Sequence, residues 1–377
     1  MMQEKIYIVG DFKKASGVTT YTLNAFSNIV HKYELIAINI SGDTALDVML
    51  SKRGWRVIHI FPANQNLCKH LTDWHHLLHK ENLRNSIVYF NYSASWNILP
   101  VLGVKLIAHA RVIMHAHNTS FGTDASGFKL KLLTVAHFVG RNIISPFLSA
   151  RFAASEAAAK WLFPKAVVRS GMVDVINNGI NLDRVKYNPD SREQIRKDKN
   201  LLRSTFVVGN VGVLEPRKNQ TRLVRIFSEI HKQSPNSRLW ILGDGTERKR
   251  LIALVDELKI SEYVDLLGNQ DDMPKYYSGM DAFVMTSRIE GLSVAYLEAQ
   301  AEGLPVFMAK GLPLGNPVSR LVSTIDLSMN DSDIARQILS ARSTPRLPGT
   351  REVADNGYDA NNLKTILESK IDEVFRS

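Results

Sequence analysis

Two glutamates separated by seven residues, Glu290 and Glu298, are the residues whose type and spacing most directly indicate a functional site in this sequence. Glu290 follows an apolar run at 282–285, which predicts a buried strand. Ser293 is a good N-cap residue and predicts that a helix begins immediately after it. In open α/β sheets, ligands bind at the carboxyl ends of the strands, where the free N–H groups of a helix N-terminus favour an anion. The segment therefore predicts a site where a phosphate meets the helix terminus and hydroxyl groups meet the carboxylates.

An isolated pair of glutamates is more often one solvated loop residue and one helix-surface residue, so the flanking residues decide between the two interpretations. Those residues are Asp281, Ser287, Gly291, Leu292, Ala299, Ala301, Gly303 and Pro305. Together with the glutamates they resemble the motif of the retaining glycosyltransferases of family 4, a group that contains many bacterial surface and exopolysaccharide enzymes. Thr286 replaces the proline that is usual in that family. The resemblance implies an α/β protein of the GT-B fold, in which two Rossmann-like domains with parallel sheets face a central cleft.

A basic turn after the apolar strand expected at 206–213 is the next point of resemblance. In the family, an arginine directly after a glycine and a later lysine bind the donor diphosphate. Lys218 matches the lysine, whereas Val213 occupies the arginine position. Arg217 could contact the diphosphate instead, since two cations beside a diphosphate ease its departure. Without the resemblance, basic residues in a turn are usually solvated.

The resemblance assigns roles to further residues in both halves of the chain. Glu290 would bind the donor sugar and Glu298 the ribose, while His117, at the end of a strand, would orient the sugar. The catalytic residues implied are His117, Lys218 and Glu290. The donor-binding residues implied are Gly17, Arg217, Lys218, Gly268, Asn269, Glu290, Gly291, Leu292, Ser293 and Glu298. The residues expected on the acceptor side are Lys13, Lys14 and His115, although a pair of solvated lysines is the alternative for the first two.

Chain length and turn chemistry predict the domain organisation. A chain of 377 residues suits two domains better than a single core. Asn178 and Gly179 provide turn chemistry at the end of a strand, where the resembled family crosses into its second domain. We expect an acceptor-side domain at 1–187 and a nucleotide-sugar-binding domain at 188–357. A final helix at 358–377 is expected to return to the first domain, as in many GT-B folds.

Composition limits the partners and the compartment. Cys68 is the single cysteine, which excludes an internal disulfide and indicates a reducing cytoplasm. The sequence contains no uninterrupted run of about 18 apolar residues, so no membrane span is predicted. The formal charge of +10 suggests an anionic partner, such as a nucleotide diphosphate or an anionic lipid surface. Nucleic acid is not expected, because no nucleic-acid-binding motif is recognisable. No metal is expected either, since neither the histidines at 70–79 nor the adjacent pair Asp271–Asp272 has a metal-site spacing.

The segment 128–148 is amphipathic and basic. Such a helix could lie against anionic lipid, which would place the protein peripherally at the inner face of the cell membrane. An ordinary core helix with charged flanks is the equal alternative.

These observations predict a hexosyltransferase-type enzyme that moves a sugar, with retention, from a nucleotide diphosphate donor to a saccharide or lipid-linked acceptor. UDP is the expected nucleotide, and polysaccharide or glycoconjugate biosynthesis is the expected context. Two alternatives remain open. One is another GT-B enzyme, such as a nucleotide-sugar epimerase or a phosphorylase. The other is a non-catalytic glycosyltransferase-like subunit, which Val213 at the arginine position suggests.

Overall fold

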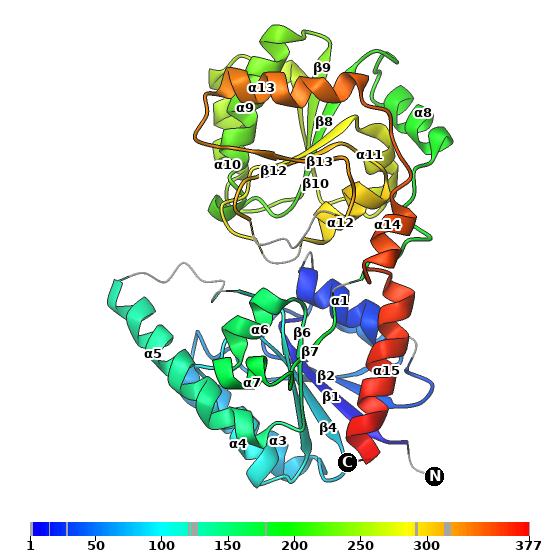
Figure 1. Cartoon of the computed structure of the whole chain (residues 1–377). Coiled ribbons are helices and arrows are strands. Elements are labelled where there is room, and N and C mark those ends of the chain that lie inside the picture. The colour runs from blue at the N-terminus through cyan, green and yellow to red at the C-terminus, as the bar shows by residue number, and fades with distance from the viewer. Residues whose placement is uncertain are drawn as a thin grey trace. The chain divides into compact units, whose positions relative to one another are not determined.

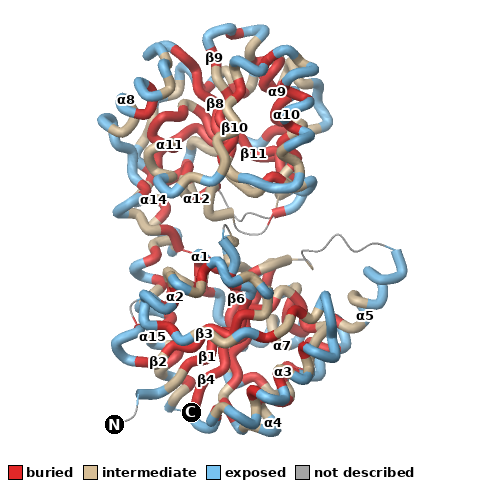
Figure 2. The backbone as a smooth tube through the Cα atoms, turned by 180° about the vertical axis from the view of Figure 1, so that it is seen from behind, coloured by how far each residue is buried: buried red, intermediate tan, exposed pale blue. Residues whose placement is uncertain are grey.

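The computed structural model describes residues 3–14, 16–27, 29–119, 121, 127–177, 179–290, 293–312 and 318–376. The chain divides into two compact units (Figure 1). The first comprises residues 1–178 and 360–377, and the second comprises residues 179–359. In each unit the buried residues concentrate on the strands and on the helix faces that cover them (Figure 2).

The described residues of the first unit form a seven-stranded parallel sheet in the order β3-β2-β1-β4-β5-β6-β7. Its strands are β1 Lys5–Gly10, β2 Glu34–Asn39, β3 Arg56–His59, β4 Ile87–Tyr92, β5 Arg111–Ala116, β6 Ala150–Ala153 and β7 Asp174–Val175. Its helices are α1 Gly17–Ala25, α2 Asp47–Lys52, α3 Leu67–Lys80, α4 Leu99–Leu106, α5 Gly127–Ile144, α6 Glu156–Leu162, α7 Lys165–Arg169 and α15 Ala360–Arg376, with a 3₁₀ turn η1 at Ser145–Phe147.

Both faces of this sheet are buried, because successive strand residues point to opposite sides. Tyr7 and Val9 belong to one core, together with residues of α3, α4 and α6. Ile6 and Ile8 belong to the other core, together with residues of α1, α2 and α15. The last helix therefore packs in the first unit, where its Leu367 is fully buried.

The second unit has a six-stranded parallel sheet among its described residues, in the order β10-β9-β8-β11-β12-β13. Its strands are β8 Phe206–Val211, β9 Ser237–Leu242, β10 Val264–Gly268, β11 Ala282–Met285, β12 Val306–Ala309 and β13 Val322–Ile325. Its helices are α8 Pro189–Asp198, α9 Gln220–Gln233, α10 Arg248–Glu257, α11 Met273–Gly279, α12 Val294–Ala301, α13 Asp331–Leu339 and α14 Thr350–Asp355. Its 3₁₀ turns are η2 Pro216–Lys218, η3 Ser261–Tyr263 and η4 Ser340–Ser343.

The strand order positions the loops of the second unit. β8 and β11 are neighbours, with Val208 opposite Ala282 and Gly209 opposite Phe283. Their carboxyl ends lie at the same edge of the sheet because the strands are parallel. The turn after β8, which contains η2, and the loop between β11 and α12 are therefore adjacent. The predicted strand at 282–285 and the predicted helix start after Ser293 are both confirmed.

The boundary region differs from the expected one. The second unit already begins at Gly179, because Ile180 pairs with Asp359 and is buried in the second unit's core. The polar run 188–200, in which the domain boundary was expected, is largely the helix α8. Its Arg196 is almost fully buried, where it donates hydrogen bonds to the Gly279 and Thr205 carbonyl oxygens and pairs with Asp281. A helix held by arginines instead of an apolar stripe carries no hydrophobic periodicity to predict it.

Within the described residues, no helix combines the length and the apolar character needed to cross a bilayer.

Candidate functional site

Glu290 is the centre of a charged cluster in the second unit. The residue is only 4% exposed. Its Oε1 accepts hydrogen bonds from Lys218 Nζ at 2.6 Å and from Ser287 Oγ at 2.6 Å. Its Oε2 lies 3.6 Å from Arg217 Nη1. A buried carboxylate is costly unless it is paired and hydrogen-bonded, and these three side chains satisfy that requirement.

The backbone of two adjacent loops holds this cluster in place. Asn219 adopts the left-handed conformation, with φ of 54°, and its Nδ2 donates to the Thr286 carbonyl oxygen at 3.1 Å. Thr286 Oγ1 donates to the Asn219 carbonyl oxygen at 2.9 Å, and the Arg288 N–H donates to the Arg217 carbonyl oxygen at 2.8 Å. The loop that carries the two cations is thereby fixed to the loop that carries Glu290.

Glycines allow the backbone behind Lys218 to pack closely. Gly243 has φ of +124°, and a Cβ atom there would lie 2.1 Å from the Gly212 carbonyl oxygen. A Cβ atom on Gly245 would lie 2.4 Å from the Leu214 carbonyl oxygen. Both contacts are impossible for a side chain, so the loop after β9 requires glycine at both positions, where it packs against the loop after β8. A tight backbone contact therefore supports the turn that contains the cations.

The two cations lie in different surroundings. The Lys218 side chain is 14% exposed, and its ammonium group contacts Glu290 directly. Arg217 is 43% exposed, and its Nε donates to Glu215 Oε2 at 2.8 Å while Nη1 points to Glu290. Val213, at the family's arginine position, contributes its carbonyl oxygen as acceptor for Gln220 Nε2. Arg217 is thus the second cation near Glu290 in place of an arginine at 213.

Glu298 has a different environment from Glu290. It lies on α12, and its Oε2 accepts a hydrogen bond from the Tyr277 hydroxyl at 2.8 Å. Burial raises the pKa of Glu298 to about 7, although the Tyr277 hydrogen bond and the charge of Arg184 act to lower it. No cation forms an ion pair with it among the described residues. The carboxyl is therefore near the midpoint of its titration at neutral pH.

The remaining predicted donor residues of the second unit lie at strand ends or helix starts. Gly268 ends β10 with φ of +69°, and a Cβ atom there would have no neighbour within 4 Å. Asn269 is exposed. Ser293 is the N-cap of α12, but its side chain makes no capping hydrogen bond. Gly291 and Leu292 lie outside the described residues.

His117 is the centre of a second group, in the first unit, whose described neighbours include an amide and aromatic rings. The ring is buried, and its Nε2 lies 2.8 Å from Asn91 Oδ1. Asn91 Nδ2 donates to Thr22 Oγ1 at 3.4 Å, so Asn91 Oδ1 is the acceptor and His117 Nε2 carries the proton. The Tyr21 ring packs at 4.8 Å from the imidazole. Residues from α1 and β4 therefore hold the ring in one orientation, with a proton on Nε2.

His115 does not fit its predicted acceptor-side position. It is fully buried on β5, where its Nδ1 bonds to the Tyr89 hydroxyl and its ring stacks 4.1 Å from His117. Burial, and then the neighbouring His117, lower the pKa of His115 well below its usual value. A neutral ring without exposed surface cannot contact an acceptor. His115 instead packs against the ring of His117.

The other predicted residues of the first unit lie at the start of α1. Gly17 is the first residue of that helix and is exposed, and a Cβ atom on it would meet nothing within 4 Å. Ser16 caps the helix by accepting from the Thr19 N–H at 3.4 Å. Lys13 and Lys14 are exposed. The structure brings neither lysine into an ion pair among the described residues.

Three positioning side chains were not assigned a role from the sequence. Ser287 was noted only as a motif residue, yet it donates to Glu290. Asn91 and Tyr277 hold His117 and Glu298 from strands or helices distant in the sequence. Asn91 alone had a detectable signal, since a polar residue inside the apolar run of β4 must have a buried partner.

Comparison with known proteins gives an independent result. Residues 191–319 match the family model of the glycosyl transferases group 1. The alpha-monoglucosyldiacylglycerol synthase of Acholeplasma laidlawii is 30% identical over 185 residues, which make up 48% of this chain and 46% of the synthase. The GDP-mannose-dependent alpha-(1-6)-phosphatidylinositol monomannoside mannosyltransferase of Mycobacterium tuberculosis is 25% identical over 321 residues, 81% of this chain and 80% of that protein.

A solved structure extends the likeness to the whole fold. Anabaena Alr3699/HepE in complex with UDP and glucose has a TM-score of 0.79 and covers 98% of this chain and 100% of its own. At 18% identity, this likeness concerns the fold alone.

Proposed function

This chain belongs to the group 1 glycosyl transferases and has their GT-B fold, and on that premise we propose that it moves a sugar from a nucleotide diphosphate donor to an acceptor hydroxyl with retention of configuration. The observation that carries the proposal is the buried cluster of Lys218, Arg217, Ser287 and Glu290 at the carboxyl ends of β8 and β11. Ligands bind at this edge of an open α/β sheet.

The reaction requires stabilisation of a departing diphosphate. When the bond from the anomeric carbon to the diphosphate breaks, the electron pair leaves with the phosphate oxygen, and the sugar becomes electron-poor. Lys218 and Arg217 are the preorganised cations that would neutralise the phosphate charge. Glu290 would hold a hydroxyl of the donor sugar, and Ser287 fixes the orientation of its carboxylate. Because these two cations would neutralise the charge of the diphosphate, we propose a reaction without a metal and without a cofactor beyond the nucleotide-sugar.

Two further residues complete the proposed donor contacts. Glu298 would accept hydrogen bonds from the ribose hydroxyls through its carboxylate, which Tyr277 already orients. His117, fixed by Asn91, would be the first unit's contact to the transferred sugar. Gly17 at the start of α1 leaves room for a ligand close to the backbone.

UDP is the nucleotide that we propose, because the solved relative of the same fold binds UDP and glucose. The acceptor would be a saccharide or a lipid-linked saccharide, since one relative is named for the glycolipid that it makes and the other for the glycolipid to which it adds mannose. Mass spectrometry of slow donor hydrolysis across UDP-, GDP-, ADP- and dTDP-sugars tests the proposal. Release of one nucleoside diphosphate with the free sugar is expected. Epimerised sugar as the product would instead indicate the epimerase alternative.

Val213 keeps one alternative of a different class open, a non-catalytic subunit with a glycosyltransferase fold. A thermal-shift panel of nucleotide-sugars separates the two functions. Stabilisation by one donor supports the transferase, whereas no stabilisation by any donor supports the non-catalytic subunit.

The helix α5 supports an anionic membrane surface as a further partner. Its outer face carries apolar side chains at helical spacing, of which Phe128 is 82%, Val135 62% and Val139 53% exposed. The described helix contains Lys129 and Lys131 but no acidic residue. Apolar residues flanked by lysines are the pattern of helices that lie in the interface of anionic lipid.

The opposite face of α5 is fixed to the first unit. A Cβ atom on Gly140 would lie 2.0 Å from the Ser95 carbonyl oxygen, and His137 Nδ1 accepts from the Ser95 N–H at 3.0 Å. The apolar stripe therefore cannot turn inward without breaking these contacts. We expect sedimentation with vesicles containing anionic lipid, weaker sedimentation with zwitterionic vesicles, and loss of binding in Val135→Glu. Equal sedimentation of Val135→Glu and wild type would contradict the proposal.

A further inference from the structure

Three arginines converge on the carboxyl end of α11, the helix that carries Tyr277. Their guanidinium groups donate to carbonyl oxygens at 277–280, which form the last turn of the helix and its cap. The last carbonyl groups of a helix lack partners inside it, and the helix dipole favours cations there. The three residues are Arg192, Arg196 and Arg346. The end of α11 is therefore fixed by side chains from outside the helix.

Of these three, Arg346 is the one whose contacts among the described residues also extend to the end of α12, the helix that carries Glu298. Its Nη2 donates to the Tyr277 carbonyl oxygen at 2.8 Å, and its Nη1 donates to the Glu302 carbonyl oxygen at 3.0 Å. The Glu302 N–H in turn donates to the Glu298 carbonyl oxygen at 3.0 Å. One guanidinium therefore holds the backbone of both helices whose side chains meet in the hydrogen bond from the Tyr277 hydroxyl to the Glu298 carboxylate.

The Glu302 carboxylate completes this junction. The residue is fully buried, and its Oε2 lies 3.4 Å from Arg346 Nη1 and accepts a hydrogen bond from Ser278 Oγ at 3.1 Å. The segment that carries Arg346 packs tightly on α12, since a Cβ atom on Gly349 would lie 1.9 Å from the Gln300 carbonyl oxygen. Desolvation offsets much of the attraction within a buried ion pair, so stability alone is a weak explanation for this one.

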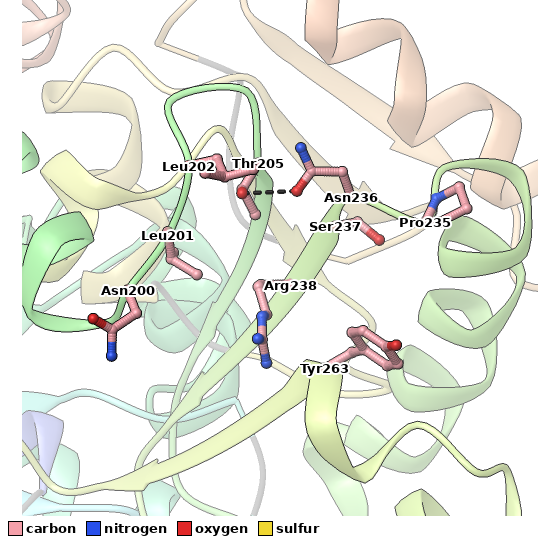
Figure 3. A pocket seen from close by; sticks show the side chains of 9 residues that line it. All are labelled: Asn200, Leu201, Leu202, Thr205, Pro235, Asn236, Ser237, Arg238 and Tyr263. Atoms are coloured by element: carbon pink, nitrogen blue, oxygen red, sulfur yellow. Dashed lines mark hydrogen bonds between the residues drawn. The ribbon is translucent and has the colours of Figure 1, made fainter.

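The other two arginines extend to different parts of the second unit. Arg192 pairs with Asp281 at 2.5 Å, and Arg196 pairs with the same carboxylate at 3.2 Å. Arg196 also donates to the carbonyl oxygen of Thr205, which lines a hollow at the amino ends of β8 and β9 (Figure 3). Neither arginine donates to Tyr277 or to α12 among the described residues. They tie α11 to the amino ends of β8 and β11 instead.

From this arrangement we propose that Arg346 is a positioning residue for donor binding, because it aligns the Tyr277 hydroxyl with the Glu298 carboxylate. The proposal rests on the proposed contact between Glu298 and the ribose of the donor. A planar guanidinium presents its N–H groups in a fixed fork, so it can hold carbonyl groups of two helices at once. A lysine keeps the charge but carries its donors on a flexible stem. Arg346→Lys therefore loosens the alignment without removing the charge.

A double-mutant cycle in denaturant unfolding tests the alignment without any ligand. Tyr277→Phe removes the hydrogen bond to Glu298 and should lower the unfolding midpoint of the wild type. In Arg346→Lys the same substitution should shift the midpoint by at most about half as much, because the hydrogen bond is already misaligned. Arg192→Lys is the matched control and should leave the full shift. Its side chain is 22% exposed, against 16% for Arg346, and it binds two of the same carbonyl groups.

Steady-state kinetics with the donor found by mass spectrometry then tests whether the alignment supports donor binding. Arg346→Lys should raise the donor KM about fivefold and change kcat by less than about twofold, as expected for a contact that is equal in the ground state and the transition state. Arg192→Lys should leave both constants near those of wild type. Additive shifts in the unfolding cycle, or equal donor KM values in the two lysine variants, would overturn the proposal.

Arg346→Met is a second variant that guards against poor folding of the lysine variant. Methionine is long and apolar enough to pack over the Tyr187 ring, where the guanidinium lies 4.4 Å from the centroid. Glu302 can then take up a proton, since burial raises its pKa to about 7. KM does not depend on the folded fraction of an enzyme, so an increase of at least about fivefold is expected here as well. A wild-type KM in both variants would overturn the proposal.

Failure of the proposed function would look different. Wild type without activity towards any UDP-, GDP-, ADP- or dTDP-sugar would overturn that function, and with it the role of Arg346 in donor binding. The unfolding cycle would then still show whether Arg346 aligns Tyr277 with Glu298. Coupling in that cycle together with an active wild type and an unchanged donor KM in Arg346→Lys would overturn this proposal alone.

Discussion

The two units place polar residues at the ends of their strands in contrasting ways. Glu290 in the second unit is surrounded by cations and by a hydroxyl, and hydrogen bonds between two adjacent loops fix it. His117 in the first unit is surrounded by neutral rings and by one amide. The first arrangement is suited to a charged group such as a diphosphate. The second is suited to neutral hydroxyls, because an imidazole held in one orientation can exchange hydrogen bonds with a hydroxyl group.

This contrast ranks the contributions that the two units should make to turnover. Electrostatic stabilisation of a leaving charge usually contributes more to catalysis than any other single effect, whereas a neutral hydrogen bond contributes about 1 kcal/mol. The following experiments therefore begin in the second unit.

Removing either member of the central ion pair should have the largest effect. Glu290→Ala and Lys218→Ala are each expected to lower turnover at least about a hundredfold, the scale of a lost charge-stabilising contact. Steady-state kinetics with the donor found by mass spectrometry measures the effect. Glu257→Ala, at an exposed glutamate of α10, serves as the matched control and should keep wild-type turnover. Near-normal turnover in both cluster variants would remove the site assignment.

The first-unit site should be less sensitive. His117→Gln is expected to lower turnover about tenfold, because it loses one hydrogen bond to a neutral hydroxyl group. Its melting temperature must be measured as well, since the ring is buried. His76→Ala, at an exposed histidine of α3, should leave turnover unchanged. A loss as large as that of Glu290→Ala would show that the site at His117 also stabilises charge, which would break the contrast between the units.

Glu298 should make donor binding depend on pH. Burial raises its pKa to about 7, and the proposed ribose contact needs the carboxylate. The KM for the donor should therefore rise about tenfold between pH 8 and pH 6, in proportion to the fall in the ionised fraction. Glu298→Gln should flatten this dependence. A wild-type KM that is constant over this range would contradict the ribose role.

The carboxyl of Glu298 should also make the stability of the unliganded protein depend on pH, but in the opposite direction. Its folded pKa lies above its ordinary value of 4.5, so its stabilising contribution is complete below that value and is lost as the pH rises through about 7. The free energy of unfolding of wild type should accordingly decline more between pH 5 and pH 8 than that of Glu298→Gln. Donor binding and unliganded stability would thus change in opposite directions with pH.

The part of this site that the sequence predicts is local. The strand at 282–285, the helix start after Ser293 and the glutamate spacing all follow from residues close in the chain. The contact between Lys218 and Glu290 spans 72 residues and exists because β8 lies beside β11, with β9 and β10 on the other side of β8. Such a strand order has no periodic signal, so only the family resemblance placed the two residues together.

Residues that position a functional side chain were harder to predict for a related reason. Asn91 lies in β4, 26 positions before His117, and their contact depends on β4 pairing with β5. The helix α8 escaped prediction because it is held by buried arginines, and Ile195 is its one buried apolar residue in the described structure. His115 was expected to be accessible to an acceptor, but neighbours such as Tyr89 of β4 and His117 bury it completely, and alternation along β5 does not show which neighbours cover each face.

Substitution of a glycine should have a small effect on stability and turnover in the first unit, at Gly17. It should be clearly destabilising in the second unit, at Gly243. Gly17→Ala introduces a methyl group that meets no protein atom, at the first turn of a helix, where alanine is favourable. Its melting temperature should equal or slightly exceed that of wild type, while turnover falls only a few-fold because the methyl narrows the space for the donor.

Gly243→Ala has the opposite expectation, since φ is +124° and the methyl group would lie 2.1 Å from the Gly212 carbonyl oxygen. This variant should lose at least about 1 kcal/mol of stability and show a lower melting temperature before any effect on the donor is considered. Thermal unfolding of both variants, followed by kinetics on those that fold, separates the two roles. If Gly17→Ala instead unfolds at a lower temperature with unchanged turnover, Gly17 belongs to the architecture of α1, and the opening at that helix start has no part in donor binding.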